Sequence, residues 1–356
     1  MFFRHRKKTL DFQEYAPESE LVAPRTERVM PEIPVIDAHT HLGPRYPNED
    51  FERRYDMDAL VDKMKAAGVV HAVDLELFSE KVFNTVLKRA EDYSEYFSYC
   101  MPVELQGFEE PDFSRVTQER LHRMGSKPQV CGIKIWKELG LELRRRNGTY
   151  ARIDDPEFEV IWNFAKAEKL PVVMHVADPT AFFKKPDRHN ERLKELLTYP
   201  MWSYYGKKMP GHSDLLGQMQ TLMKRHRDVT FVIAHVGSLA NDLDRVEQMM
   251  DANSNMYVDI AAVLAELGRQ PLRFHAFAEK LQDRILFGTD MFGGDPLCYE
   301  QYYRFLGTRD EFFPYHPEGR CTQGDWRIYG TGLSETVLRK IYYSNAEKVY
   351  IKRAHK

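Results

Sequence analysis

Two histidines separated by a single residue end the apolar run Val35–His41, which reads VIDAHTH. Alternate side chains of a β-strand point to the same face, so His39 and His41 are expected to project together from the carboxyl end of a strand. Two imidazoles that converge on one point are able to hold a divalent metal ion. The alternative is that one or both are ordinary histidines at a strand end, because the His-x-His pattern is short.

Three further polar residues also end apolar runs, namely His175, His235 and Asp290. A single histidine at such a place is ordinarily a core residue with a backbone hydrogen-bond partner. A buried cluster of four imidazoles and a carboxylate is different, because it is costly unless a cation or a proton network ties it together. The sequence therefore predicts either a metal site or a proton network where these strands end.

The elements that must position these residues alternate along the chain. Short apolar runs typical of strands are separated by amphipathic segments with helical spacing. The predicted strands are residues 35–41, 69–75, 96–103, 130–136, 171–176, 229–236, 255–261 and 284–290. Asp155 followed by Pro156 indicates a helix start, and Ser334 is expected to cap a last helix that closes the barrel.

Eight buried strands alternating with helices favour an α/β fold of the TIM type, a closed parallel (β/α)8 barrel whose strand carboxyl ends meet at one rim. The rival is an open doubly wound sheet, but no Gly-x-Gly-x-x-Gly follows the first strand. Residues 1–33 have mixed charge and three prolines, and are expected to form an N-terminal arm. Residues 34–356 are expected to form a single barrel domain.

Two connections are longer than a barrel requires, and both are rich in aromatic residues. They are residues 177–228, after the fifth strand, and 291–332, after the eighth. Long loops that follow barrel strands lie at the catalytic mouth, so these are expected to serve as lids or pocket walls. Aromatic loops of this kind also form subunit interfaces, which leaves a homodimer as an alternative use.

The composition favours small-molecule chemistry. The 356 residues are 43% hydrophobic and 29% charged, with a net charge of −3, so no basic field attracts nucleic acid or anionic lipid. The four cysteines are widely spaced, which suggests neither a disulfide framework nor a zinc ribbon. No apolar stretch has the length of a signal peptide or a membrane span. We expect a cytoplasmic protein with a small-molecule substrate.

Several motifs together resemble the amidohydrolase superfamily. The branch that the sequence resembles is the amidohydrolase-related group that includes aminocarboxymuconate-semialdehyde decarboxylase and the resorcylate-type decarboxylases. The resemblance runs from about residue 33 to residue 350, and its specificity comes from the order and spacing of the motifs. They are VIDAHTH at 35–41, His175, AHVG at 234–237, FGTD at 287–290 and YSNAEK at 343–348.

Carried over position by position, the resemblance implies one divalent metal ion held by His39, His41, His175 and Asp290, with His235 beside a water on that metal. The implied metal is zinc, with manganese as the alternative. This agrees with the donor chemistry, since neutral imidazoles and a carboxylate suit either metal. Asp290 is expected to accept a proton from the water, and His235 to orient the water or stabilise an oxyanion.

The predicted fourth strand carries Lys134 and, two residues later, Trp136. Some binuclear members of the superfamily have a metal-bridging carboxylated lysine in this region. An inward Lys134 is therefore able to bridge a second metal or to bind a substrate carboxylate, whereas the alternative is a lysine that snorkels between barrel and helices. Because the branch resembled is usually mononuclear, we expect Lys134 to bind substrate. Trp136 either forms an aromatic wall of the pocket or packs in the core.

These residues lead to three hypotheses. The first is a metal-dependent hydrolase that uses a metal-activated water on a C–N, C–O or strained C–C bond of a small polar compound bearing a ring or a carboxylate. The second is a non-oxidative decarboxylase or hydratase on the same site. The third is a metal-free barrel that only binds a ligand or partner.

Overall fold

The computed structural model describes residues 18–295, 298–316 and 323–352. In these residues nine parallel strands form one sheet in the order β8-β7-β6-β5-β4-β3-β2-β1-β9. The strands are β1 Val35–His41, β2 Val69–Leu75, β3 Phe97–Pro102, β4 Val130–Ile135, β5 Val172–Met174, β6 Phe231–Ile233, β7 Met256–Asp259, β8 Ile285–Leu286 and β9 Met291–Phe292.

Backbone hydrogen bonds bring the two ends of this sheet together at β1. The Ala38 N–H donates to the Phe287 carbonyl at 2.9 Å, and the Asp290 N–H donates to the His39 carbonyl at 2.8 Å. Residues 287–290 join β8 to β9, and β9 pairs with β1. The predicted parallel barrel with helices between its strands is therefore confirmed, with β9 as an addition.

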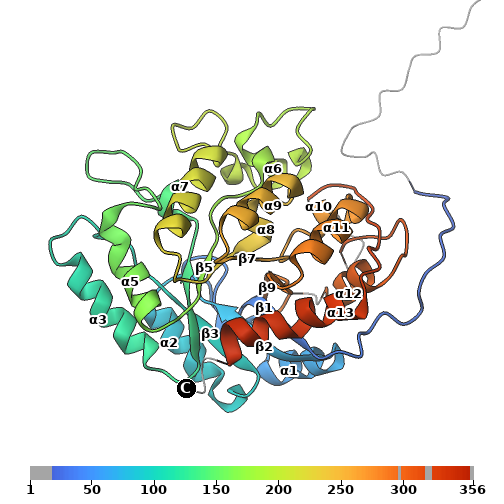
Figure 1. Ribbon diagram of the computed structural model, residues 1–356, viewed down its shortest axis with the longest axis horizontal. Coiled ribbons are helices and arrows are strands. Elements are labelled where there is room, and N and C mark those ends of the chain that lie inside the picture. Colours follow the sequence, from blue (N-terminus) through green and yellow to red (C-terminus); the bar gives the residue numbers. More distant parts are fainter. Residues whose placement is uncertain (1–17, 296–297, 317–322, 353–356) are drawn as a thin grey trace, which may run out of the picture.

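Helices lie outside the strands (Figure 1). They are α1 Met57–Ala66, α2 Glu80–Arg89, α3 Phe113–Gly125, α4 Glu138–Leu141, α5 Glu159–Ala167, α6 Leu193–Thr198, α7 His212–Arg225, α8 Ala234–Ser238, α9 Leu243–Ala252, α10 Leu264–Gly268, α11 Pro271–Leu281, α12 Tyr299–Gly307 and α13 Glu335–Arg339. Short 3₁₀ helices span Phe51–Arg53, Glu91–Tyr93, Pro156–Phe158, Thr180–Phe183 and Pro200–Trp202, and α13 continues into π-helical turns at Lys340–Ser344 and Glu347–Ile351.

Side-chain caps begin some of these helices but not the two that the sequence suggested. Asp56 accepts the Ala59 N–H at the start of α1, as expected for a helix N-cap. At Ser334 no side-chain cap hydrogen bond forms before α13. Asp155 precedes a 3₁₀ helix, and its carboxylate accepts from Arg145 Nη2 at 2.6 Å. Asp155 and Ser334 do lie at the predicted N-cap positions, but neither side chain makes the capping hydrogen bond, and the Asp155 carboxylate is bound by Arg145 instead.

The sixth and eighth strands are shorter than predicted. β6 ends at Ile233, and His235 and Val236 have left-handed backbone conformations with φ of 58° and 52°. Asp290 lies between β8 and β9 with φ of 64°. A left-handed residue cannot continue a strand. His235 and Asp290 therefore lie in turns at the rim rather than in the strands themselves.

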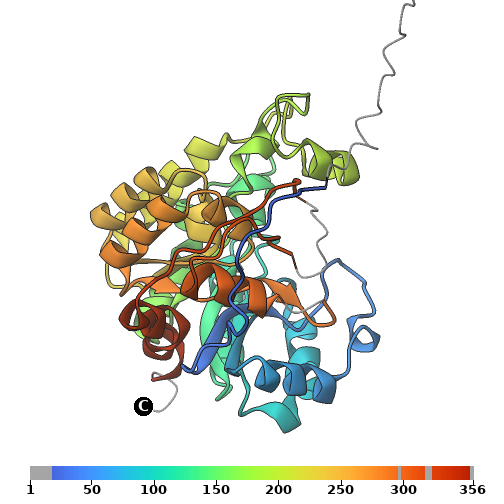
Figure 2. The same ribbon diagram turned by 90° about the vertical axis from the view of Figure 1, so that its right-hand side faces the viewer.

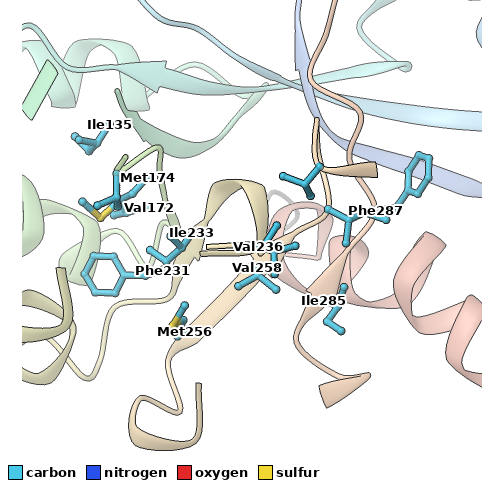
Figure 3. Close-up of a cluster of buried hydrophobic side chains, with 14 of the residues drawn as sticks. Ile135, Val172, Met174, Phe231, Ile233, Val236, Met256, Val258, Ile285 and Phe287 are labelled. Atoms are coloured by element: carbon cyan, nitrogen blue, oxygen red, sulfur yellow. The ribbon is translucent and has the colours of Figure 1, made fainter. Parts of the chain in front are cut away.

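Two apolar layers hold the barrel. The outer layer packs the strands against the helices, and Figure 3 shows part of it along β4 to β8. A separate cluster takes residues from all eight main strands, as expected for the barrel interior. It comprises Ile36, Ala38, Val73, Leu75, Cys100, Cys131, Val173, Val232, Tyr257 and Leu286, together with Ala346, Val349 and Tyr350 from the C-terminal helix.

Tyr350, in the π-helical turn Glu347–Ile351, packs against the interior cluster and allows a stability test there. The Tyr350 hydroxyl is buried and has no hydrogen-bond partner among the described residues. Tyr350→Phe should therefore leave the free energy of unfolding unchanged or raise it by up to about 1 kcal/mol. Tyr303→Phe is the matched control and should cost about 1 kcal/mol, because the Tyr303 hydroxyl donates to the Ala67 carbonyl at 2.8 Å. Urea denaturation measures the free energy of unfolding of both variants. A greater loss of stability in Tyr350→Phe than in Tyr303→Phe would show that the Tyr350 hydroxyl does have a hydrogen-bond partner.

Segments outside the barrel are of two kinds. Residues 18–33 contain no helix or strand and cross the outside of the barrel (Figure 2), where the Thr26 hydroxyl donates to Asp310 at 2.6 Å. The predicted long connections are present, and the one from β5 to β6 carries α6 and α7. No helix in the described ranges is long and apolar enough to cross a membrane.

Candidate active site

His39 and His41, at the carboxyl end of β1, both contact Asp290. The Nε2 atom of His41 donates to Asp290 Oδ1 at 3.0 Å, and His39 Nε2 lies 3.2 Å from the same oxygen. The close approach of this turn to β1 depends on Gly288, where a β-carbon would lie 2.8 Å from the His39 β-carbon. The end of β1 and the turn between β8 and β9 therefore bring together three of the predicted site residues.

His235 is fixed in the same cluster by its own backbone and by two acceptors. Its N–H donates to Asp259 Oδ1 at 2.9 Å, and its Nδ1 donates to the Ala261 carbonyl at 2.9 Å. The ring centre lies 5.1 Å from that of His39. Left-handed backbone at a non-glycine residue costs of order 1–3 kcal/mol and is concentrated at functional sites. With Nδ1 as the donor, the neutral imidazole keeps the Nε2 lone pair available.

Asp259 is a site residue that the sequence reasoning missed. It ends β7, is completely buried, and accepts from His39 Nδ1 at 2.8 Å. A carboxylate that accepts from one ring nitrogen of a histidine fixes the tautomer and the orientation of the ring, and so directs the other nitrogen, here Nε2, toward the cluster. The strand-end pattern could not single it out, because in the sequence Asp259 lies within the predicted strand 255–261 and is followed by further apolar residues.

The charges in the cluster distinguish its histidines. Burial favours a low pKa at His39, but the Asp259 carboxylate and the hydrogen bond to Asp290 raise the pKa to about 9. Burial lowers the pKa of His41 to about 4 and that of His175 to about 3. Burial opposes ionisation of Asp290, yet the hydrogen bonds from His39 and His41 and the positive charge of His39 hold its pKa well below the ordinary value. Near pH 7, His41 and His175 are therefore neutral, the form that binds metals.

The donor set fits one divalent cation. His39, His235 and Asp290 each offer a ligand atom, and these atoms lie within 4.8 Å of one another. Imidazole nitrogens with a carboxylate oxygen suit zinc and manganese. His41 adjoins this group through Asp290, and the His175 ring centre is 4.6 Å from that of His235. The predicted ligands thus gather in one place, with His235 rather than His175 among the three nearest donors.

The side chain of His175 makes its hydrogen bond to a different carboxylate, that of Asp178. Its Nε2 atom donates to Asp178 Oδ1 at 3.2 Å. Asp178 also accepts from Lys137 Nζ at 2.6 Å and from the Tyr204 hydroxyl. Burial opposes ionisation of Asp178, but Lys137 and His175 hold its pKa well below the usual range. Asp178, Lys137 and Tyr204 were not predicted, although Asp178 follows His175 by only three residues.

A cavity of about 770 Å³ opens onto the cluster and is lined by both predicted substrate residues, Lys134 and Trp136. Lys134 is only 2% exposed, and its ammonium has no hydrogen bond or ion pair within the described ranges. Burial lowers the pKa of Lys134, whereas the charges of Asp290 and Asp259 raise it. Lys134 therefore points into the cavity and does not snorkel to the outside. Aromatic rings form much of the wall, namely Phe78, Trp136, Phe182, Tyr199, Trp202, Tyr204 and Phe292.

Solved structures share this fold at low sequence identity. A 2,6-dihydroxybenzoate decarboxylase from Rhizobium is 14% identical, with 89% of this chain and 98% of that chain covered and a TM-score of 0.58. A 4-oxalomesaconate hydratase from Rhodopseudomonas palustris is 15% identical, with 90% and 96% covered and a TM-score of 0.52. An uncharacterised TIM-barrel protein from Bordetella bronchiseptica is 16% identical, with 91% and 100% covered and a TM-score of 0.53.

A search of curated proteins finds no match for the sequence. The sequence profile described as amidohydrolase matches residues 36–351, a span that contains the whole cluster and both substrate residues. The barrel topology and the motifs at the strand ends agree with this match, and the resemblance drawn from the sequence is confirmed. The chain therefore belongs to the amidohydrolase family.

Proposed function

We propose that this protein is a metal-dependent hydrolase that acts on a small polar compound with a carboxylate and a flat or ring-shaped portion. The observation that carries the proposal is the placement of the His/Asp donor cluster and the buried ammonium of Lys134 on one cavity with aromatic walls. Such a cavity has the size and the mixed lining of a small-molecule site.

A divalent ion, zinc or manganese, would supply the positive charge that activates a water molecule and polarises the bond under attack. Asp290 is ionised, so it serves as the base that takes a proton from the water. His235 donates to Ala261 through Nδ1, so its single Nε2 lone pair serves either the ion or the water. We assign it to orienting the water, which leaves His39, His41, His175 and Asp290 to hold the ion. The Nδ1 hydrogen bond of His235 supports the role proposed for it.

Lys134 is the group proposed to bind the substrate carboxylate. A buried ammonium without a partner is costly, and a carboxylate that pairs with it offsets the cost. The aromatic wall, with Phe78 and Trp136 6.3 Å apart between ring centres, suits the flat face of the same molecule.

A lyase is the second candidate, either a non-oxidative decarboxylase or a hydratase. The same aromatic wall favours an unsaturated ring substrate. The neighbouring structures named above as a decarboxylase and a hydratase show that this fold accommodates such reactions. In this case Asp290 or His235 would move a proton to or from carbon instead of activating water for hydrolysis.

Isotope incorporation separates the candidates. The protein, loaded with zinc or manganese, is incubated with a panel of small lactones, amides and aromatic carboxylates in H₂¹⁸O and in D₂O. Hydrolysis places ¹⁸O in the product without release of CO₂. Release of CO₂ with deuterium on carbon would overturn the hydrolase in favour of a decarboxylase, and addition of both ¹⁸O and deuterium would identify a hydratase.

Lys134→Met tests the substrate side of the proposal. A lost charge-assisted hydrogen bond is worth about 1.5–3 kcal/mol, so KM should rise by roughly 10-fold to 150-fold. Lys63→Met, at an exposed position of α1, is the control and should leave KM unchanged. Steady-state kinetics on any substrate from the panel measures both, and an unchanged KM for the Lys134 variant would remove Lys134 from the binding site.

A further inference from the structure

Asp178 is a buried carboxylate that receives donors from three separate parts of the chain. Its side chain is 6% exposed, and its Oδ1 accepts from His175 Nε2 at 3.2 Å. Its Oδ2 accepts from Lys137 Nζ at 2.6 Å and from the Tyr204 hydroxyl. All four residues line the cavity that contains the candidate metal site.

The donors come from elements with different roles. His175 directly follows β5, and Lys137 follows β4 by two residues. Tyr204 belongs to the long connection between β5 and β6, where its N–H donates to the Phe182 carbonyl at 2.8 Å and its ring packs 4.9 Å from that of Phe183. One carboxylate therefore joins this connection to the catalytic rim.

The contact with His175 also determines where that ring carries its proton. A carboxylate only accepts hydrogen bonds, so the nitrogen that faces Asp178 must be the protonated one, Nε2. In the neutral ring the lone pair is then on Nδ1. A carboxylate partner of this kind orients a histidine for metal binding or proton transfer, and its loss typically costs 10-fold to 100-fold in metal affinity or activity.

We propose that Asp178 is a positioning residue that fixes the tautomer and ring orientation of His175 and couples them to the cavity wall through Lys137 and Tyr204. Its effect on metal binding rests on the proposed function, whereas its effect on the His175 tautomer does not. Asp178 itself has no contact with Asp290 or β1 among the described residues, so it acts through His175.

The test uses the full chain carrying Asp178→Asn, which retains the shape of the side chain and removes its charge. In metal-free protein with ¹⁵N-labelled histidine, long-range ¹H–¹⁵N spectra should show His175 protonated on Nε2 in the wild type and in mixed tautomers in the variant, with His175→Gln identifying the signal. Competition with a chromophoric chelator should show a loss of Zn²⁺ affinity of roughly 10-fold to 100-fold. Glu142→Gln, another carboxylate of the cavity wall, should change neither value.

Tyr204→Phe is the second variant, because it removes one donor and leaves the charge of Asp178 in place. It should keep the His175 tautomer and increase proteolytic cleavage within residues 199–209. If Asp178→Asn leaves both the His175 tautomer and the Zn²⁺ affinity unchanged, the proposal is overturned. If Asp178→Asn does not fold, Tyr204→Phe decides instead, and unchanged cleavage within residues 199–209 would overturn the proposal. A wild-type protein that binds no Zn²⁺ but shows the Asp178-dependent tautomer would instead contradict the proposed function alone.

Discussion

Replacing Asp290 by asparagine should remove most of the bound metal and lower turnover by about a thousandfold. Asp290 is the carboxylate contacted by both His39 and His41, and the amide of asparagine supplies neither its charge nor its basicity. Loss of a metal and of the base removes several kcal/mol of transition-state stabilisation, and each 1.36 kcal/mol is tenfold in rate. Elemental analysis of the purified variant and its kcat on the identified substrate measure the two effects.

The matched control is Asp283→Asn. Asp283 lies just before β8, whereas Asp290 lies after it. The exposed side chain of Asp283 pairs with Lys340. This control should retain about the wild-type metal content and turnover, since exposed ion pairs contribute little. If Asp290→Asn kept both the metal and the activity while Asp283→Asn behaved as expected, the carboxylate at position 290 would have no part in the chemistry.

The metal-free protein should lose stability as the pH rises from about 6.5 to 9. The pKa of His39 is about 9 in the folded chain, against about 6.5 for an unperturbed histidine. Because the pKa of His39 is higher in the folded chain than in the unfolded chain, the proton on His39 stabilises the folded state fully below pH 6.5. This stabilisation is lost as the pH rises through 9. The difference is on the order of 3 kcal/mol, and urea denaturation of chelator-treated protein across this range measures it.

The same proton should compete with a metal ion. Binding at His39 requires the neutral ring, so metal affinity should rise by up to about tenfold per pH unit below pH 9 and level off above it. Asp259→Asn removes the main charge that holds the proton on His39 and should flatten both pH dependences. Asp228→Asn, at an exposed position, should leave them unchanged. Equal slopes in the wild type and the Asp259 variant would show that Asp259 does not control His39.

The sequence by itself determined the barrel and most of the rim. Apolar runs of strand length alternate with amphipathic helices, and parallel strands place all their carboxyl ends on one side. These two regularities are enough to predict that His39, His41, His175 and Asp290 gather in one cluster. They also placed Lys134 on the fourth strand, although the direction of its side chain stayed open. The local sequence pattern determines which segments form strands and which residues end them, because strand and helix periodicity depend on residues that are close together in the sequence.

Only the tertiary structure decided how the cluster is held. Asp259 and His39 are 220 residues apart in the chain, and no local pattern pairs them. The left-handed turn at His235 and the shared carboxylate at Asp178 likewise depend on partners from other elements. Hydrogen bonds between distant segments form only when the barrel has closed. Strand periodicity therefore predicts which residues reach the rim, whereas the packed fold determines which of them carry a proton and which partners orient them.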